Sequence, residues 1–259
     1  MRIDITMPAS WADLSQVQLR RIFQVIVAVQ DQNQNVPFRD ADDYAAQTAA
    51  QVATTVFFEW SGLQIVCPYA HGYLVSHNGE EGVLDAETVT AAIVPLGWAK
   101  ELPTYPVRLD VIDGAHAVPA DISSGLSFDS WLACENNWQA YQLSQDPKWL
   151  REMATVLYNK ENISLDHAET LSIFYWWAGV KSMVSEMFPS FFHPATGDDE
   201  QEITADSLRR NMDAQIRALT KGDITKENEI LAMDAIRALT ELDAQAREYE
   251  ELNRKYPKK

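Results

Sequence analysis

The chain has 259 residues, of which 46% are hydrophobic, and it carries a formal net charge of −17 at pH 7. A chain of this length and apolar content can bury a sizeable core, which excludes disorder throughout and allows one large domain or two modest ones. Acidic residues outnumber basic ones both before and after position 197, so no segment forms the Lys/Arg stripe that a phosphate backbone requires. Direct DNA or RNA binding is therefore disfavoured.

No secretory signal or membrane span is expected. The opening residues, MRIDITMPAS, lack a basic segment followed by an apolar run. Lys181 and Glu186 interrupt the longest apolar stretch, so it falls short of the roughly 18 apolar residues of a membrane span. We expect an intracellular protein whose two cysteines, Cys67 and Cys134, are reduced and buried.

The first sixty residues predict a short strand and two helices. The segment RIDITM, residues 2–7, alternates apolar and polar side chains as a strand does. Ser15 and Gln18 have the spacing of a capping box before a helix over residues 16–30. A second, alanine-rich helix is expected from about Asp42 to Trp60.

Residues 63–120 predict a small antiparallel β module between helices. Short strands are expected around two tight turns, Asn78-Gly79 and Asp113-Gly114, because these dipeptides favour two-residue hairpin loops. Between the hairpins, Asp85 can cap a helix over residues 87–98, which Pro95 must kink or end.

From Ser127 onward the pattern is helical. The expected helices cover residues 127–145, 148–158, a stretch that starts at Ser164, residues 205–220, and a final stretch from Thr225. An acidic connector around residues 196–202 and the break Lys221-Gly222-Asp223 separate the last of them.

Residues 172–192, SIFYWWAGVKSMVSEMFPSFF, are unusually rich in aromatic side chains. At 100° per residue the large apolar residues fall within an arc of roughly 140°. They are Ile173, Trp176, Trp177, Val180, Val184, Met187 and Phe188, with Ser172, Tyr175, Gly179, Ser182 and Glu186 opposite. Such a face predicts a central packing helix rather than a lipid-facing one. Phe191 and Phe192 follow Pro189 and cannot continue that face, so they either fold back onto the core or form a docking patch.

The last predicted helix is amphipathic over its whole length. Its apolar positions are Ile236, Leu239, Leu242, Ala246, Tyr249 and Leu252, and the residues between them are largely charged. About thirty residues of helix would be roughly 45 Å long, which is more than a compact domain of this size needs. We expect it either to form an αα-hairpin with the preceding helix or to contact another chain.

No group of residues predicts catalysis, a metal site or a cofactor site. Cys67, His71 and His77 offer three possible metal ligands, one fewer than a structural zinc site uses. Asp110, Asp113 and His116 fall on a predicted hairpin, where the turn already explains Asp113.

Glu135 beside Cys134 lacks an orienting partner in the sequence, and the familiar nucleotide-binding and hydrolase motifs are absent. The alternative is an enzyme of unknown class with a pocket between the β module and the helices. That enzyme would use some of five residues, His71, His77, Asp110, His116 and Cys134.

Three segments together resemble a known group of proteins. They are MPASWADLSQVQLRRIFQVI, LACENNWQAYQLSQDPKWLREMATVLY and FYWWAGVKSMVSEMFPSFF. The chain resembles, over about residues 8–195, an uncharacterised family of phage and prophage-type proteins from gut Bacteroidota, associated with tail or virion assembly. The resemblance implies an assembly or structural role and a place in the host cytoplasm or the virion. It implies no functional residues.

We predict an α+β, mainly α-helical protein: a helical bundle with a small inserted antiparallel β module and a long C-terminal helix or αα-hairpin. Residues 1–195 form the core domain, with the β module at about 63–120, and residues 196–259 form the acidic connector and the helical hairpin. The expected function is non-enzymatic protein binding, as a chaperone-like tail assembly factor or a minor structural component. The expected partners are tail or virion proteins, with self-association through the last helix, and the contact residues are Phe191, Phe192, Tyr249 and Leu252.

Overall fold

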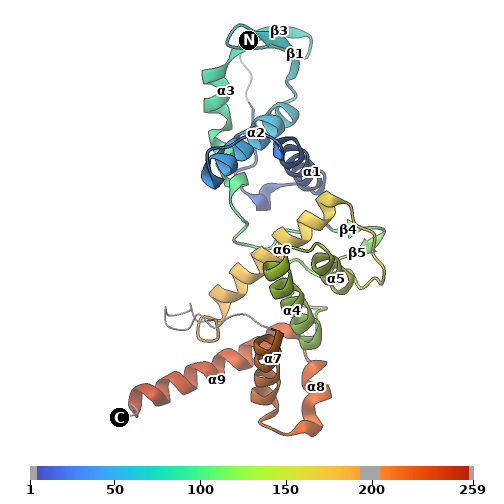
Figure 1. Cartoon of the computed structure of the whole chain (residues 1–259), viewed down its shortest axis with the longest axis vertical. Coiled ribbons are helices and arrows are strands. Elements are labelled where there is room, and N and C mark those ends of the chain that lie inside the picture. The colour runs from blue at the N-terminus through green and yellow to red at the C-terminus, as the bar shows by residue number, and fades with distance from the viewer. Residues whose placement is uncertain (1–4, 193–204, 257–259) are drawn as a thin grey trace. The chain divides into compact units, whose positions relative to one another are not determined.

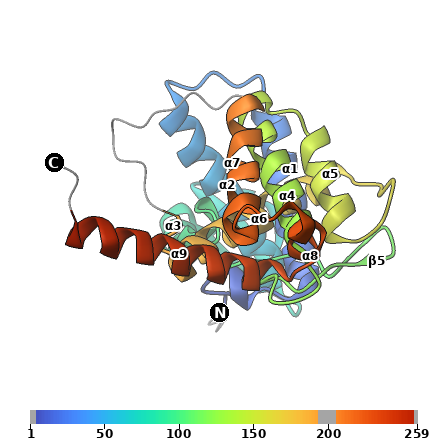
Figure 2. The same ribbon diagram turned by 90° about the horizontal axis from the view of Figure 1, so that it is seen from below.

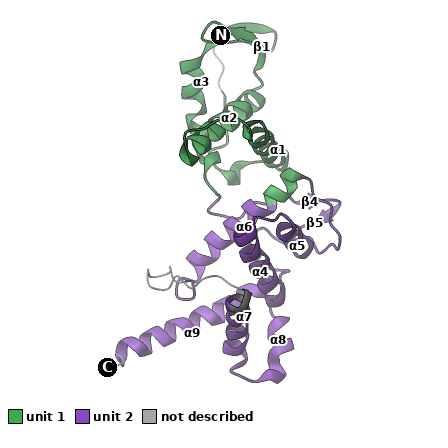
Figure 3. Ribbon diagram, viewed as in Figure 1, with its two compact units in different colours: residues 1–102, 167–172 green, residues 103–166, 173–259 purple. Residues whose placement is uncertain are grey.

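The chain is mainly helical with two small antiparallel sheets, which confirms the predicted fold class (Figures 1 and 2). A computed structural model describes residues 5–192 and 205–256. The chain divides into two compact units (Figure 3), with residues 1–102 and 167–172 in unit 1 and residues 103–166 and 173–259 in unit 2. The boundary expected near residue 195 and the acidic connector after it lie outside the described residues. The expected β module is divided between the units, because its two hairpins belong to different ones.

Unit 1 combines helices with a three-stranded sheet. In its described residues the elements run in this order: η1 (Trp11–Asp13), α1 (Gln16–Asn33), α2 (Ala41–Ser61), β1 (Gln64–Tyr69), β2 (Gly72–His77), β3 (Glu80–Asp85), α3 (Ala86–Ile93) and η2 (Val94–Lys100). Both predicted helices are confirmed, and the Ser15–Gln18 capping box forms as the spacing predicted. The predicted strand over residues 2–7 is not observed in its described part, Ile5 to Met7.

The sheet of unit 1 has the order β1-β2-β3 and is antiparallel throughout. Asn78 and Gly79 both have positive φ, as the predicted two-residue turn between β2 and β3 requires. The side chain of Asp85 accepts a hydrogen bond from the backbone N–H of Thr88 at 2.7 Å and so caps α3, which ends at Ile93 before Pro95. The sheet therefore continues directly into α3.

Two tryptophans hold the segment before α1 in place. The indole N–H of Trp11 donates to the carbonyl of Glu101 at 2.9 Å, and that of Trp98 donates to the carbonyl of Pro8 at 3.0 Å. The ring of Trp11 also stacks on Phe23 with a centroid distance of 5.9 Å. These contacts explain why residues 5–8, which have no secondary structure, follow a defined path within unit 1.

Unit 2 is built mostly from helices. Its elements run in this order: β4 (Val111–Ile112), β5 (Ala115–His116), α4 (Phe128–Ser144), α5 (Lys148–Leu157), α6 (His167–Met187), α7 (Ala205–Thr220), η3 (Ile224–Lys226), α8 (Glu227–Leu231) and α9 (Ala235–Lys255). The first residues of α6 belong to unit 1. Helix α6 begins three residues later than predicted, because the N–H of Ser164 donates instead to the side chain of Asp113 at 3.0 Å.

The aromatic stretch belongs to the core of unit 2, as predicted. Trp176 and Trp177 are fully buried, and the ring centroid of Trp177 lies 5.2 Å from that of Trp131 on α4. The predicted face of α6 is wrong at two positions. Met187 is exposed, whereas Gly179, expected on the polar side, packs so closely that an added Cβ would lie 2.8 Å from the Cα of Pro106. Other parts of unit 2 thus cover α6 on more than its apolar arc.

The predicted continuous helix of about thirty residues from Thr225 is wrong. The chain breaks after Leu231, and Asp234 caps a new helix, α9, by accepting from the N–H of Arg237 at 3.2 Å. Two backbone hydrogen bonds fix this break to the start of α4: the N–H of Phe128 donates to Met233 at 2.7 Å, and that of Ala235 donates to Leu126 at 2.9 Å. The first half of α9 then packs within the chain against α4 and α7.

Candidate protein-binding surfaces

The second half of α9 carries apolar side chains that nothing in the described structure covers. Tyr249, Leu252 and Tyr256 are between 57% and 67% exposed, whereas Leu239 and Leu242 earlier in the helix are buried. Figures 1 and 2 both show this half extending away from α4 and α7. Tyr249 and Leu252 are three residues apart and share one face of α9, and Tyr256 is the first residue after the helix. We call Tyr249, Leu252 and Tyr256 the α9 stripe.

The segment after α6 turns back onto α9. The N–H groups of Ser190 and Phe191 both donate to the side chain of Asp243, at 2.8 and 3.0 Å, and Asp243 is itself buried. The rings of Phe191 and Phe192 meet edge to face at 4.8 Å, and the Lys181 ammonium lies 5.0 Å from the centre of the Phe192 ring.

Phe191 and Phe192 are both half-buried. They therefore pack partly against the fold, as the first alternative predicted, and leave part of each ring exposed, as a docking patch requires. They line a small cleft of about 130 Å³ together with residues of α4 and α7, including Trp131 and Met212. Their contact with a partner stays a prediction.

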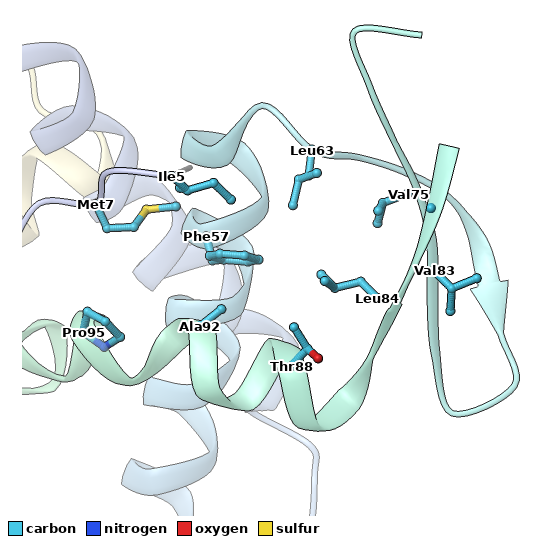
Figure 4. A pocket seen from close by; sticks show the side chains of 11 residues that line it. Ile5, Met7, Phe57, Leu63, Val75, Val83, Leu84, Thr88, Ala92 and Pro95 are labelled. Carbon is cyan, nitrogen blue, oxygen red and sulfur yellow. The ribbon is translucent and has the colours of Figure 1, made fainter. Parts of the chain in front are cut away.

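A pocket in unit 1 lies between its sheet and its helices. This pocket of about 700 Å³ is lined by residues from the segment before α1, from α2, from the sheet and from α3. Figure 4 shows Ile5, Met7, Phe57 and Leu84 around it, and Thr88 is the one polar side chain that lines it. A pocket of this kind suits apolar side chains or an apolar ligand.

The sheet beside this pocket is itself poorly covered. All six residues of the edge strand β1 are exposed, including Ile65, Val66 and Tyr69. Val83 of β3 is 57% exposed and also lines the pocket. Ile65 pairs with Val75 and Val83 pairs with Leu74, so Ile65 and Val83 point to opposite faces of the sheet. The exposed apolar residues Ile65, Val66, Tyr69 and Val83 are together called the sheet surface. An exposed apolar edge strand is a ready site for another polypeptide.

The sheet and the residues on either side of it in the sequence carry carboxylates but no lysine or arginine. Residues 40–99 contain eight acidic residues and no lysine or arginine: Asp40, Asp42, Asp43, Glu59, Glu80, Glu81, Asp85 and Glu87. Glu80, Glu81, Asp85 and Glu87 form no ion pair with any described residue. This local charge was not predicted, because it is hidden when net charge is summed over much longer segments.

Neither unit contains all five residues that the enzyme alternative would use. His71 and His77 belong to unit 1, and Asp110, His116 and Cys134 belong to unit 2. A pocket does lie between the sheet and helices of unit 1, but none of the five lines it.

Within unit 2, Cys134 is fully buried. Asp110 is exposed just before β4, and His116 is exposed on β5. Asp110 forms an ion pair with Arg108, and Asp113 forms one with Lys160 at 2.7 Å. Lys160 and the N–H of Ser164 lower the pKa of Asp113, which marks a carboxylate held in its charged form by structural contacts. Among the described residues, no three His, Cys, Asp or Glu side chains are placed to hold a metal ion.

The two cysteines differ in exposure, so the expectation of two buried thiols is wrong for Cys67. Cys67 is exposed on the edge strand β1, and Cys134 is buried on α4. Burial raises the pKa of the Cys134 thiol well above its usual range, with a further contribution from the charge of Glu135.

Ellman's reagent should therefore react with one thiol per native chain and with two after denaturation, because the thiolate is the reactive species. Cys67→Ser should remove the native reaction, and Cys134→Ser should leave it intact. Rapid native reaction in the Cys67→Ser variant would show that Cys134 is accessible.

No protein-family model, curated protein or solved structure matches this chain. In the part of the chain that the structure describes, no helix combines the length and the apolar character that crossing a membrane requires. What the protein does is therefore inferred from its own surfaces.

Proposed function

We propose that this protein binds other proteins through the α9 stripe and serves in the assembly of a phage-type tail, as a chaperone-like factor or a minor structural component. The observation that carries the proposal is the α9 stripe itself. Tyr249 and Leu252 stand on a helix whose first half is packed and whose second half extends from the fold, and Tyr256 directly follows that helix. An amphipathic helix held in this way can enter an apolar groove of a partner.

The chemistry of the stripe suits binding. Tyrosine presents a large apolar ring with a polar hydroxyl, and such residues are enriched among those that contribute most to protein interfaces. The net charge of −17 keeps a protein with exposed apolar side chains dispersed in solution. Together these properties match what a protein that holds an assembly partner needs.

The tail assignment is supported by the resemblance of three segments of the sequence to phage and prophage-type proteins. Phe191 and Phe192 would form a second contact region, because the segment that carries them follows α6 and is bound to Asp243 of α9 through the N–H of Phe191. At 100° per residue, Asp243 and Leu252 point to opposite sides of α9, so the two regions lie on different sides of this helix.

Co-expression with phage-type tail and virion proteins tests this function. The chain should raise the soluble yield of at least one of them and co-purify with it. The double variant Tyr249→Glu/Leu252→Glu should reduce the retained partner about tenfold or more, since charged side chains in the centre of an interface are strongly unfavourable.

Leu143→Glu is the matched control. Leu143 is 58% exposed and lies on α4, so it has the exposure and helical setting of Leu252 without belonging to the stripe. If no tail or virion protein is retained, the assembly role is wrong. If the control and the double variant lose binding equally, the stripe is not the contact.

A further inference from the structure

We infer that the pocket of unit 1 binds a small amphiphile with an apolar chain and a cationic head group, of the long-chain alkylammonium class. All of the residues that line the pocket belong to unit 1, whereas the α9 stripe belongs to unit 2. This ligand is therefore distinct from the protein partners proposed for the stripe, and its binding does not depend on them.

The pocket has walls from four parts of unit 1. Phe57 comes from α2, Val75 and Leu84 from the sheet, Ala92 from α3, and Ile5 from the segment before α1. Figure 4 shows these side chains around a common space. The volume of about 700 Å³ falls within the roughly 300–1,000 Å³ that small-molecule sites occupy. An enclosure of this kind suits a compact ligand better than a passing polypeptide segment.

The lining of the pocket selects an apolar chain. Leu84 and Ala92 line the pocket and are only half-buried, so a ligand would remove further apolar area from water at both. Thr88 is the one polar side chain that lines the pocket, and it is exposed. Any polar group of the ligand therefore belongs on the solvent side, near Thr88.

Two carboxylates lie beside the lining residues. Side chains alternate along β3, so Glu80 points to the same face as Gly82 and Leu84, and it lies about 7 Å along the strand from Gly82. Asp85 accepts a hydrogen bond from the backbone N–H of Thr88 at 2.7 Å. This bond lowers the pKa of Asp85, so its carboxylate is charged at neutral pH.

These charges select a cationic head group over an anionic one. Asp85 already occupies the N-terminus of α3, which would otherwise attract an anion. No lysine or arginine occurs between residues 40 and 99. Arg20, Arg21 and Arg39, also in unit 1, each form an ion pair with a carboxylate of the unit. A fatty-acid carboxylate would meet like charge at this pocket, whereas an ammonium group would meet opposite charge.

Calorimetric titration of the full chain at neutral pH and physiological salt tests this inference. Three probes share one unbranched alkyl chain and differ in head-group charge: decylammonium, decanol and decanoate. Decylammonium should saturate one site per chain and bind about tenfold or more tightly than decanoate, with decanol between them.

Ala92→Phe tests whether the probes enter the pocket. The larger side chain should fill part of the space and weaken binding of decylammonium and decanol about tenfold or more. Ala91→Phe is the matched control, because Ala91 is exposed on the same helix and does not line the pocket. It should bind as the original chain does. Circular dichroism reports whether each variant is folded, and Ala92→Leu is the milder change if Ala92→Phe is not.

Glu80→Gln/Asp85→Asn tests the role of charge. Asparagine is also a good helix cap, so this variant removes both charges while α3 keeps its cap. Binding of decylammonium should weaken about threefold, the effect of exposed charges, while binding of decanol stays unchanged. Asp42→Asn/Glu81→Gln is the matched control and should alter neither. It removes the same two charges, but Glu81 points to the opposite face of the sheet, and Asp42 lies about 22 Å along α2 from Phe57.

Three results would overturn the inference. They are an absence of saturable binding by decylammonium, equal affinity for decylammonium and decanoate, and unchanged binding of decylammonium by folded Ala92→Phe. The last result would place the probe elsewhere on the acidic surface.

The proposed protein-binding function can fail separately. Tyr249→Glu/Leu252→Glu should bind decylammonium as the original chain does, and Ala92→Phe should still retain a tail or virion protein through its α9 stripe.

Discussion

Replacing Trp177 by alanine is expected to lower the free energy of unfolding by about 3–5 kcal/mol, the range for removing a large buried aromatic side chain. Trp177 is fully buried, its ring lies 5.2 Å from that of Trp131, and its indole N–H donates to Glu135 at 3.0 Å. The change would leave a cavity in unit 2 and remove one donor from a half-buried carboxylate, which Lys181 would still contact.

Urea denaturation followed by circular dichroism measures this loss without depending on tryptophan fluorescence. Trp149→Ala in the same unit is the matched control. Trp149 is half-buried, and its indole N–H donates to the hydroxyl of Ser144 at 3.1 Å. Its removal should cost clearly less. Equal losses for the two variants would show that α6 is not the central packing helix.

Asp243→Ala is expected to lower the free energy of unfolding by about 2–3 kcal/mol, because two backbone donors would lose a charged acceptor. One carboxylate oxygen receives the N–H groups of Ser190 and Phe191, and Asp243 itself is buried. These bonds hold the segment with both phenylalanines against α9. Without them the segment should separate from α9 while the helix stays folded.

Amide hydrogen exchange at Ser190 and Phe191 reports that separation directly. Both amides should exchange faster in Asp243→Ala, while amides inside α6 stay protected. Glu241→Ala, an exposed change two residues away, should alter neither exchange nor stability by more than about 0.5 kcal/mol. Unchanged exchange at both amides in Asp243→Ala would mean that other contacts hold the segment.

Most elements could be predicted because their ends depend on neighbouring residues. The capping box of Ser15 and Gln18 and the positive φ of Asn78 and Gly79 are such short-range features. The break before α9 also has a local signal, since Asp234 is a good helix cap, but the strong amphipathic pattern on both sides concealed it. The hydrogen bonds to Leu126 and Phe128 that fix this break join residues more than a hundred positions apart.

The surfaces were harder to predict than the elements. Tyr249 and Leu252 were identified from the sequence and are exposed, because a helix too long for its core leaves one end uncovered. The exposure of β1 was not foreseen, since the sequence predicts a strand at Ile65 and Val66 but does not show that the sheet ends at that strand. Whether a strand lies at an edge depends on pairing between distant segments, which a pattern along the chain does not contain.

The junction at the start of α9 has a mechanical consequence. Two backbone hydrogen bonds, from Phe128 to Met233 and from Ala235 to Leu126, clamp the base of a helix of 21 residues. At 1.5 Å per residue that helix is about 30 Å long, and its far half has no lateral support in the described structure. The near half is held by packing against α4 and α7 and by the hydrogen bonds to Asp243, so a sideways load at Tyr249 would bend the helix near Asp243, where the packed half ends. The packed half would transmit such a load to α4 and α7 in the core of unit 2.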